Sequence, residues 1–318
     1  MSAISTRTVR LHEYGEPLSV LVEERDDVPD PGPGQVRVLV EATGLNPADW
    51  EICRGFMGGL LPRGIGFDVA GTVDAVGEGV ADVALGDSVF GTADIAGQTT
   101  GGAADVAILR EWARMPEGLA PTQAATLPMV VKTADWTLGA LGVQHVRTVL
   151  IHGAGSMVGF AAVQAATALG VRVIATAGPT YAADLEGFGA TVMSYGAGMV
   201  ERIREVAADP IDLVIDTAPP TPGTIADLLR LVDDPSNVVT ISNHAEARES
   251  GARVNIDLLP GVADRLTPPR LVFERYAARV VDGTFRLPIA RVLPLDAWRE
   301  AVELSTSRHS RGKVVLVP

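Results

Sequence analysis

The sequence has a single cysteine, Cys53, among 318 residues. One cysteine excludes a disulfide framework and any zinc site built from several cysteines, and it is typical of a reducing compartment. Basic residues are also scarce, because 26 Lys and Arg stand against 39 Asp and Glu, a net charge of −13. This excess of acid argues against nucleic acid or an anionic membrane as the main partner. No apolar signal core occurs near residue 1, so we expect a cytoplasmic protein.

Residues 148–171 contain no Asp, Glu, Lys or Arg and are predicted to form a strand, a tight turn and a helix. An apolar V-L-I run leads into Gly153, Gly155 and Gly159, and Gly170 ends the helical pattern like a C-cap. Small residues at such a turn let a phosphate approach the backbone, and the free N–H groups of the helix start favour its charge. The turn is therefore predicted to hold the pyrophosphate of a dinucleotide.

This interpretation competes with two others. The spacing from Gly155 to Gly159 is one residue longer than in G-x-G-x-x-G, but a second predicted strand at 171–177 ends about 20 residues past the turn, where such units contact the adenosine ribose. A membrane span is disfavoured because lipid cannot satisfy the backbone groups that the glycines free. A nucleophile elbow at Ser156 is disfavoured because alanine and valine stand where it needs glycine.

The two halves of the chain differ in pattern. Residues 1 to about 120 are predicted to be β-rich, and their short strands indicate a partly open barrel. Beyond 121 helices appear, and from 148 strands alternate with helices, which indicates a parallel sheet covered on both faces. Later strands are predicted at 191–194, 212–216 and 237–242, with helices near 180–188, 198–208 and 223–232. The closing segment is predicted as helix 271–281, short strands around 287–293, helix 296–305 and strand 312–317.

Four stretches, taken in order along the chain, resemble one family. They are G-L-N-P-A-D at 44–49, G-F-D-V-A-G at 66–71, the turn at 152–159, and R-G-K-V-V at 311–315. Together they resemble the zinc-independent quinone oxidoreductases of the medium-chain dehydrogenase/reductase superfamily. The resemblance implies an α/β protein with two domains. A GroES-like partly open β-barrel domain takes residues 1–122 and 271–318, and a doubly wound Rossmann domain with a parallel sheet takes residues 123–270.

The resemblance also bears on metals. Zinc relatives place a cysteine where Asn46 stands and a His-Glu pair where Phe67 and Asp68 stand, and their structural zinc needs four further cysteines. Phe67 cannot bind a metal and Asn46 is a poor zinc ligand. We therefore expect neither zinc site.

For the cofactor, no Asp or Glu ends the second strand, where an NAD enzyme usually carries one, so NADPH is expected over NADH. No basic partner for the 2′-phosphate occurs between 176 and 182. Ser156 replaces a family glycine, and it is interpreted either as a hydroxyl donor to the pyrophosphate or as a helix-start serine. The expected cofactor-binding residues are Thr133, Gly153, Ala154, Gly155, Ser156, Met157, Val158, Thr176, Gly178, Thr180, Tyr181, Tyr195 and Asn243.

Candidate catalytic residues are Asn46, Tyr14 and Asp49. Asn46 matches a nicotinamide-pocket position and is a candidate donor to a substrate carbonyl, or else bonds a local turn. Tyr14 is a candidate proton donor, and Asp49 is expected to hold its loop rather than move protons. Lys313 is expected just before the last strand, as a surface charge or a cofactor contact.

A last departure concerns substrate. Relatives often carry an aromatic residue where Ala103 stands, and its loss would widen the cleft. Trp50 either refills that space or is a core anchor.

These observations predict NADPH-dependent reduction of a quinone or an α,β-unsaturated carbonyl compound by metal-free hydride transfer. The substrate is a small molecule, and the family implies a homodimer. Alcohol–ketone interconversion is disfavoured because the zinc ligands are missing. A catalytically silent nucleotide-binding sensor or structural protein stays open, because the turn is altered and the phosphate-binding lysine is absent.

Overall fold

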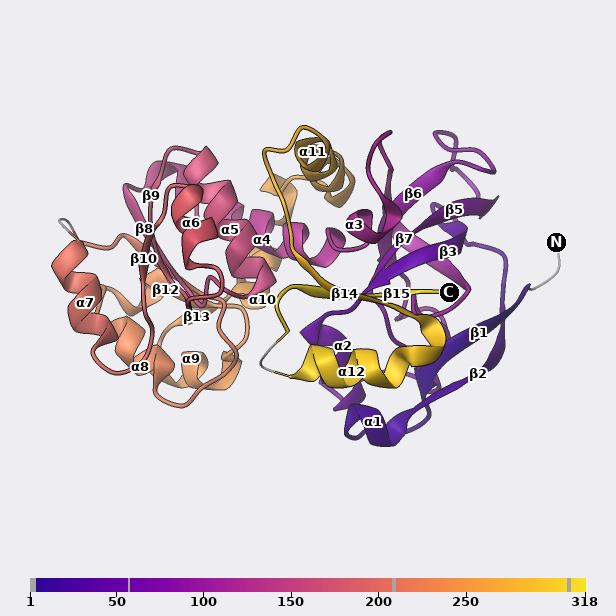
Figure 1. The fold of residues 1–318 in the computed structure, drawn as a ribbon, viewed down its shortest axis with the longest axis horizontal. Coiled ribbons are helices and arrows are strands. Elements are labelled where there is room, and N and C mark those ends of the chain that lie inside the picture. The colour runs from indigo at the N-terminus through magenta and orange to yellow at the C-terminus, as the bar shows by residue number, and fades with distance from the viewer. Residues whose placement is uncertain (1–3, 57, 208–209, 308–309) are drawn as a thin grey trace. The chain divides into compact units, whose positions relative to one another are not determined.

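A computed structural model describes residues 4–56, 58–207, 210–307 and 310–318 (Figure 1). The chain separates into two compact units. Unit 1 comprises residues 1–132 and 268–318, and unit 2 comprises residues 133–267. The sequence had placed these boundaries at 122/123 and 270/271.

Unit 1 is built from two sheets. A three-stranded sheet has the order β2 (Leu21–Val28), β1 (Ile4–Leu11), β4 (Arg63–Gly64). A six-stranded sheet has the order β14 (Ile289–Pro294), β15 (Lys313–Val317), β3 (Val36–Gly44), β5 (Asp68–Val76), β6 (Ser88–Ala93), β7 (Val106–Arg114). Strand β3 also pairs with β7, so these strands close on one another as a barrel. The predicted barrel is confirmed.

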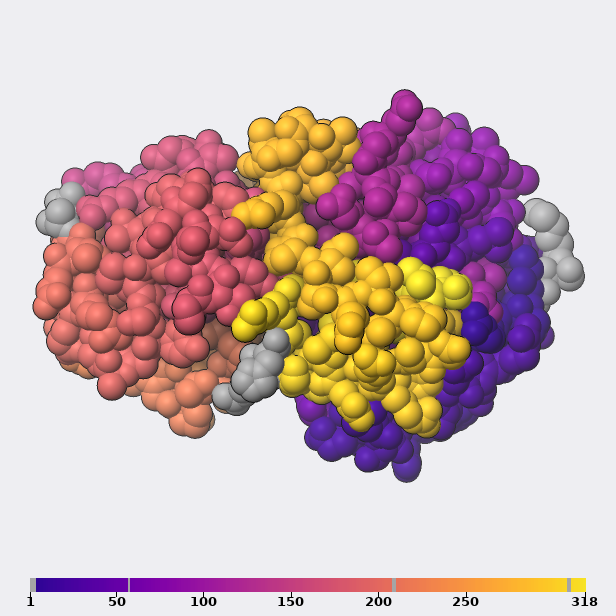
Figure 2. Space-filling model, viewed as in Figure 1, coloured from indigo at the N-terminus to yellow at the C-terminus, as the bar shows by residue number. Residues whose placement is uncertain are grey.

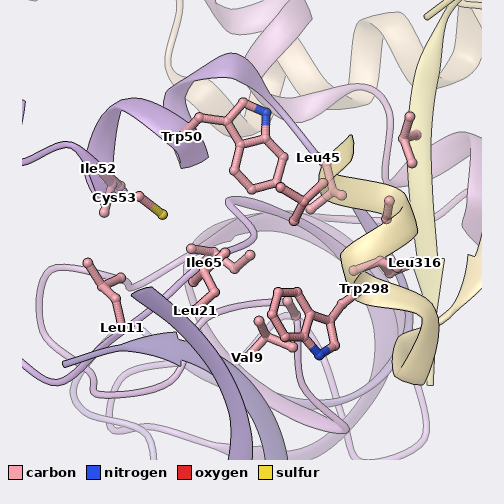
Figure 3. Packing of buried hydrophobic residues seen from close by; sticks show 14 of the residues in the cluster. Val9, Leu11, Leu21, Leu45, Trp50, Ile52, Cys53, Ile65, Trp298 and Leu316 are labelled. Atoms are coloured by element: carbon pink, nitrogen blue, oxygen red, sulfur yellow. The ribbon is translucent and has the colours of Figure 1, made fainter. Parts of the chain in front are cut away.

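Both ends of the chain contribute to unit 1. Its helices are α1 (Pro17–Val20), α2 (Pro47–Cys53), α3 (Pro121–Ala124), α11 (Pro269–Val281) and α12 (Trp298–Thr306). Figure 2 shows the C-terminal residues, orange to yellow, on the surface of unit 1 beside the indigo N-terminal residues. Trp50 of α2 and Trp298 of α12 belong to one buried cluster with Leu45, Ile65 and Leu316 (Figure 3). This cluster joins the last strand to the segment around residue 46.

Unit 2 contains the predicted parallel sheet. Its order is β10 (Thr191–Met193), β9 (Arg172–Thr176), β8 (Thr148–His152), β11 (Leu213–Asp216), β12 (Val238–Thr240), β13 (Arg253–Val254), and every pairing is parallel. Numbered along the chain within this unit, the order is 3-2-1-4-5-6, that of a doubly wound dinucleotide-binding sheet. The α/β fold class predicted from the sequence is confirmed.

The helices between these strands are α5 (Met157–Ala168), α6 (Ala182–Gly187), α7 (Met199–Val206), α8 (Thr224–Leu229) and α9 (His244–Ser250), and α10 (Asn255–Leu258) follows β13. Helix α4 (Pro128–Ala140) contains the boundary between the units. Apolar residues of α7, α8 and α9 pack with Leu150, Ile174, Val214 and Val238 into a core cluster on the sheet. Within the described residues, no helix has both the length and the apolar character needed to cross a bilayer.

Candidate functional site

The glycine turn of unit 2 links β8 to α5 and is fastened to the end of β9. Gly153 has φ 72°, a left-handed conformation that suits glycine. Its N–H donates to Thr176 Oγ1 at 3.0 Å, and the Ala154 N–H donates to the Thr176 carbonyl at 2.8 Å. The turn predicted from the sequence is present, and Thr176 lies directly beside it.

Ser156 is the N-cap of α5. Its Oγ accepts from the Gly159 N–H at 3.0 Å, and its hydroxyl donates to Thr217 Oγ1 at 3.1 Å. The hydroxyl hydrogen is thus used within the protein, which favours the helix-start interpretation of Ser156 over a bond to pyrophosphate. The N–H groups of Met157 and Val158 have no intrahelical acceptor because they lie in the first turn, and they are suited to an anion.

Two glycines of the turn have different roles, one in packing the helix and one in leaving space for a ligand. A methyl group at Gly159 would overlap Thr217 Oγ1 and approach Ala154 Cα to 2.8 Å, so Gly159 allows close packing of the helix start. A methyl group at Gly155 would meet only Tyr181 Cδ2, at 3.7 Å. The space above Gly155 is therefore open to a ligand.

His152, the last residue of β8, is a buried neighbour of the turn. Its Nδ1 is hydrogen-bonded to Thr176 Oγ1 at 2.7 Å. Burial lowers the pKa of His152 to about 4. The imidazole is therefore neutral near pH 7, and it orients the threonine that holds Gly153.

A cavity of about 320 Å³ lies beyond the end of β9. Its lining includes Gly178, Glu186, Ser194 and Tyr195. The Tyr195 ring lies 3.7 Å from the position of a methyl group at Gly178, so these two predicted residues come together. Thr180 is exposed and outside this lining, whereas Tyr181 is buried with its ring edge against Phe160.

Glu186 is an acidic residue that the sequence reasoning missed. It lies on α6, ten residues beyond the end of β9 at Thr176, so an inspection of the strand end overlooks it. Its spacing of four from Ala182, which also lines the cavity, places both on one face of α6.

Two other expected cofactor residues lie elsewhere in unit 2. The Asn243 side chain donates to Glu246 Oε2 at 2.7 Å, and its backbone N–H donates to Thr240 Oγ1 at 3.0 Å. Thr133 is half-buried on α4.

The candidate catalytic residues of unit 1 belong to a buried polar cluster. Asn46 Nδ2 donates to Asp68 Oδ2 at 3.0 Å and to the Gly44 carbonyl at 3.2 Å. Lys313 Nζ donates to Asn46 Oδ1 at 2.6 Å and to Asp68 Oδ2 at 3.1 Å. Both amide hydrogens of Asn46 are used in this arrangement, so donation to a substrate requires exchange of the longer Gly44 contact.

The expectation for Lys313 is corrected. Lys313 is the first residue of β15, within the strand predicted at 312–317, and its side chain is only 3% exposed. It is therefore not a surface charge. Residues 313–316 of β15 are all buried, so the unbroken V-V-L-V run that follows Lys313 is the signal of a strand buried on both faces that the sequence offered.

Asp49 holds its loop, as expected from the sequence. It is the third residue of α2, and its carboxylate accepts from the Asn46 N–H at 2.8 Å and the Gly66 N–H at 2.6 Å. Complete burial raises the pKa of Asp49 to about 7, and the nearby Asp68 acts in the same direction. The N-P-A-D letters at 46–49 are a helix-start signal, although the sequence reasoning did not predict α2.

The remaining candidates have local roles. Tyr14 is 39% exposed, and its hydroxyl donates to the Gly59 carbonyl at 3.0 Å. Trp50 is a core anchor whose Nε1 donates to Ser305 Oγ at 3.1 Å. Ala103 is fully buried in the same cluster, and the effect of its small side chain on the width of a cleft stays a prediction.

Comparison with known proteins identifies the family to which the chain belongs. Residues 32–120 match the family model of the alcohol dehydrogenase GroES-like domain, and residues 188–316 match that of the zinc-binding dehydrogenases. A quinone oxidoreductase of Sus scrofa is 30% identical over 97% of each chain. The chain belongs to the medium-chain dehydrogenase/reductase superfamily and is quinone oxidoreductase-like.

Two further relatives of this superfamily member illustrate its range. An alcohol dehydrogenase superfamily protein from Novosphingobium aromaticivorans has a solved structure with TM-score 0.81, 28% identity, and coverage of 98% of this chain and 99% of its own. The pikromycin polyketide synthase component PikAII of Streptomyces venezuelae is 42% identical over 47% of this chain, which is 4% of its own length.

Zinc, which one family model names, does not fit the residues of this superfamily member. Asn46 Oδ1 and Asp68 Oδ2 already accept from the Lys313 ammonium, and Phe67 packs against the core cluster. Among residues 4–56, 58–207, 210–307 and 310–318, no three His, Cys, Asp or Glu side chains are grouped to hold a metal.

Proposed function

We propose that this oxidoreductase reduces quinones or α,β-unsaturated carbonyl compounds with NADPH, by hydride transfer without a metal. The main support for this proposal is the glycine turn at the start of α5, which is hydrogen-bonded to the end of β9. The turn belongs to a doubly wound parallel sheet, and the chain is quinone oxidoreductase-like. The nicotinamide dinucleotide supplies the hydride when bound.

The chain's own residues bind the cofactor and orient the substrate carbonyl. The N–H groups of Met157 and Val158 meet the pyrophosphate, and the open side of Gly155 allows its approach. The cavity beside Gly178 and Tyr195 takes the adenosine end. In unit 1 the buried Asn46 amide is the donor to a carbonyl oxygen on which charge develops, and Asp68 and Lys313 hold that amide in place.

The choice of NADPH rests on the strand end at Thr176, which carries no acid for the ribose hydroxyls. Glu186 is the observation that favours NADH, because its carboxylate lines the cavity and would repel a 2′-phosphate. Glu186→Gln distinguishes NADPH from NADH as the cofactor. If the 2′-phosphate lies near this side chain, the substitution increases the preference for NADPH.

The test is initial-rate oxidation of NADPH and of NADH against a panel of quinones and 2-enones. We expect turnover with both substrate classes and a higher kcat/KM for NADPH. Preference for NADH throughout would overturn the cofactor proposal. Tight NADPH binding without turnover would favour the silent sensor instead. Cytoplasmic location and a homodimer complete the proposal, and sedimentation velocity tests the latter.

A further inference from the structure

Lys313 is a cation at the centre of the buried cluster in unit 1. Its ammonium lies 2.6 Å from Asn46 Oδ1 and 3.1 Å from Asp68 Oδ2, with the lysine side chain 3% and the aspartate 0% exposed. These residues come from β15, from the residue before α2 and from β5. One charged group thus joins three distant parts of the sequence.

The surroundings are built to hold this ammonium. Asp68 Oδ2 also accepts from Asn46 Nδ2, and Asp68 Oδ1 accepts from the Met129 N–H at 2.9 Å. A methyl group at Gly44 would approach Lys313 Cε to 3.3 Å and overlap the Ala125 carbonyl oxygen, so only glycine leaves the lysine stem its room. Removing one partner of such a buried pair leaves an uncompensated charge, which is strongly destabilising.

Asn46 and Asp68 stand at positions where zinc-dependent relatives carry metal-site residues, yet the oxygens at both positions face an ammonium. A zinc ion needs the same lone pairs, and two cations cannot share them in a buried site. We propose that Lys313 is a built-in cation that takes the place of the metal: it neutralises Asp68, fixes the Asn46 amide and excludes zinc.

This inference deepens the metal-free reaction proposed above and rests on it for its catalytic meaning. Lys313 is a positioning residue in this account. Its bond to Asn46 Oδ1 determines which way the amide faces, because the amide oxygen accepts from the ammonium while the amide nitrogen donates to Asp68, which Lys313 also contacts. The fold therefore contains a preorganised charge at the carbonyl site without recruiting a metal.

The exclusion of metal is tested with Co²⁺ as a spectroscopic probe. Asn46→Cys supplies a thiol ligand beside Asp68, and Asn46→Cys/Lys313→Met also removes the ammonium. Burial raises the pKa of Cys53, the native cysteine, to about 12, so it does not compete as a thiolate. We expect the cobalt–thiolate charge-transfer band in the double variant only. An equal band in Asn46→Cys, or no band in either variant, would overturn the exclusion.

The cation itself is tested by chemical rescue. Lys313→Ala leaves a cavity beside Asp68, and we expect propylammonium to restore most of the lost melting temperature and kcat, whereas neutral propanol restores neither. Lys313→Met is the matched control, because its stem fills the cavity and leaves no room for the amine. No rescue of Lys313→Ala, or equal rescue by propanol, would show that the stem packs and the charge is dispensable. Co²⁺ spectra and melting temperatures do not require turnover, so they remain decisive even where no quinone or enone is reduced.

Discussion

At the scale of single residues, several polar side chains of the candidate sites are hydrogen-bonded within the protein before any ligand arrives. Asp49 accepts two backbone N–H groups, Ser156 caps a helix, and Thr176 holds both Gly153 and His152. Such buried groups are costly to leave unsatisfied. Their first role is therefore to fix the loops on which a ligand would bind.

The pH dependence of stability follows from Asp49. Its pKa is about 7 in the folded protein, well above that of an exposed carboxyl, because the side chain is buried. Between those two values the folded state keeps a proton that the unfolded chain releases, so the contribution of Asp49 to the free energy of unfolding falls as the pH rises from about 4 to 7, whereas the lowered pKa of His152 acts in the opposite direction. Urea unfolding between pH 5 and 8 checks this. Asp49→Asn should flatten the fall, and an unchanged slope would assign it to another group such as Asp216, whose pKa burial raises to about 6.

Two substitutions at Ser156 distinguish its role in helix capping from a role in phosphate binding. Ser156→Ala removes the acceptor for the Gly159 N–H and should cost about 1 kcal/mol in unfolding free energy. Ser156→Asp keeps a capping acceptor, so its stability should stay near that of the native chain, but its charge should weaken NADPH binding at the helix start. Unfolding curves and NADPH titrations measure the two effects. Equal loss of affinity in both variants would contradict this division.

At the scale of elements, the strand-to-helix turn combines two demands on glycine. Gly159 accommodates Thr217, which is an internal packing requirement, whereas Gly155 faces open space. Glycine is therefore needed for packing and stability at position 159, and for the approach of a ligand at position 155.

Two alanine substitutions in this turn should affect different properties, one the stability of the fold and the other the affinity for NADPH. Gly159→Ala overlaps Thr217 Oγ1 and should destabilise the protein by about 1–3 kcal/mol. Gly155→Ala should leave the melting temperature unchanged and weaken NADPH binding, because its methyl group enters the open side of the turn. Gly261→Ala, with no atom within 4 Å of the added methyl group, is the control and should change neither. Unchanged NADPH affinity in Gly155→Ala would place the phosphate elsewhere.

At the scale of the whole molecule, each unit has its own buried core. Trp50 and Trp298 anchor one cluster of unit 1, and the apolar side of the parallel sheet anchors the cluster of unit 2. The turn belongs to unit 2, and the Lys313 cluster belongs to unit 1.

Ligand binding should stabilise the folded chain by mass action. At 100 times its Kd, NADPH should add about 2.7 kcal/mol to the unfolding free energy and raise the melting temperature. Thermal scans with NADPH, NADH and 5′-AMP measure the order of these shifts. We expect the largest shift from NADPH and the smallest from 5′-AMP, which lacks the pyrophosphate. Equal shifts for all three would mean that the turn contributes nothing to binding.

The sequence by itself determined the order of elements, because apolar periodicity and glycine punctuation are local properties. It predicted the sheet of unit 2, the turn at 153–159 and the barrel. It missed β2, whose L-V-E-E-R-D-D-V letters are mostly charged, and α2, whose start signal is short. Glu186 escaped notice because the helix, rather than the strand end, carries it to the cavity.

Only the tertiary structure determined the contacts and the pKa values of the buried ionisable residues. Lys313 is 245 residues from Asp68 and 267 from Asn46, and no local pattern specifies that an ammonium and two oxygens meet in a buried site. Burial also decided the pKa of Asp49 and of His152, because desolvation depends on the neighbours that packing supplies. The sequence set the strands and turns, whereas packing brought the Lys313 ammonium to Asp68 and lowered the pKa of the His152 imidazole.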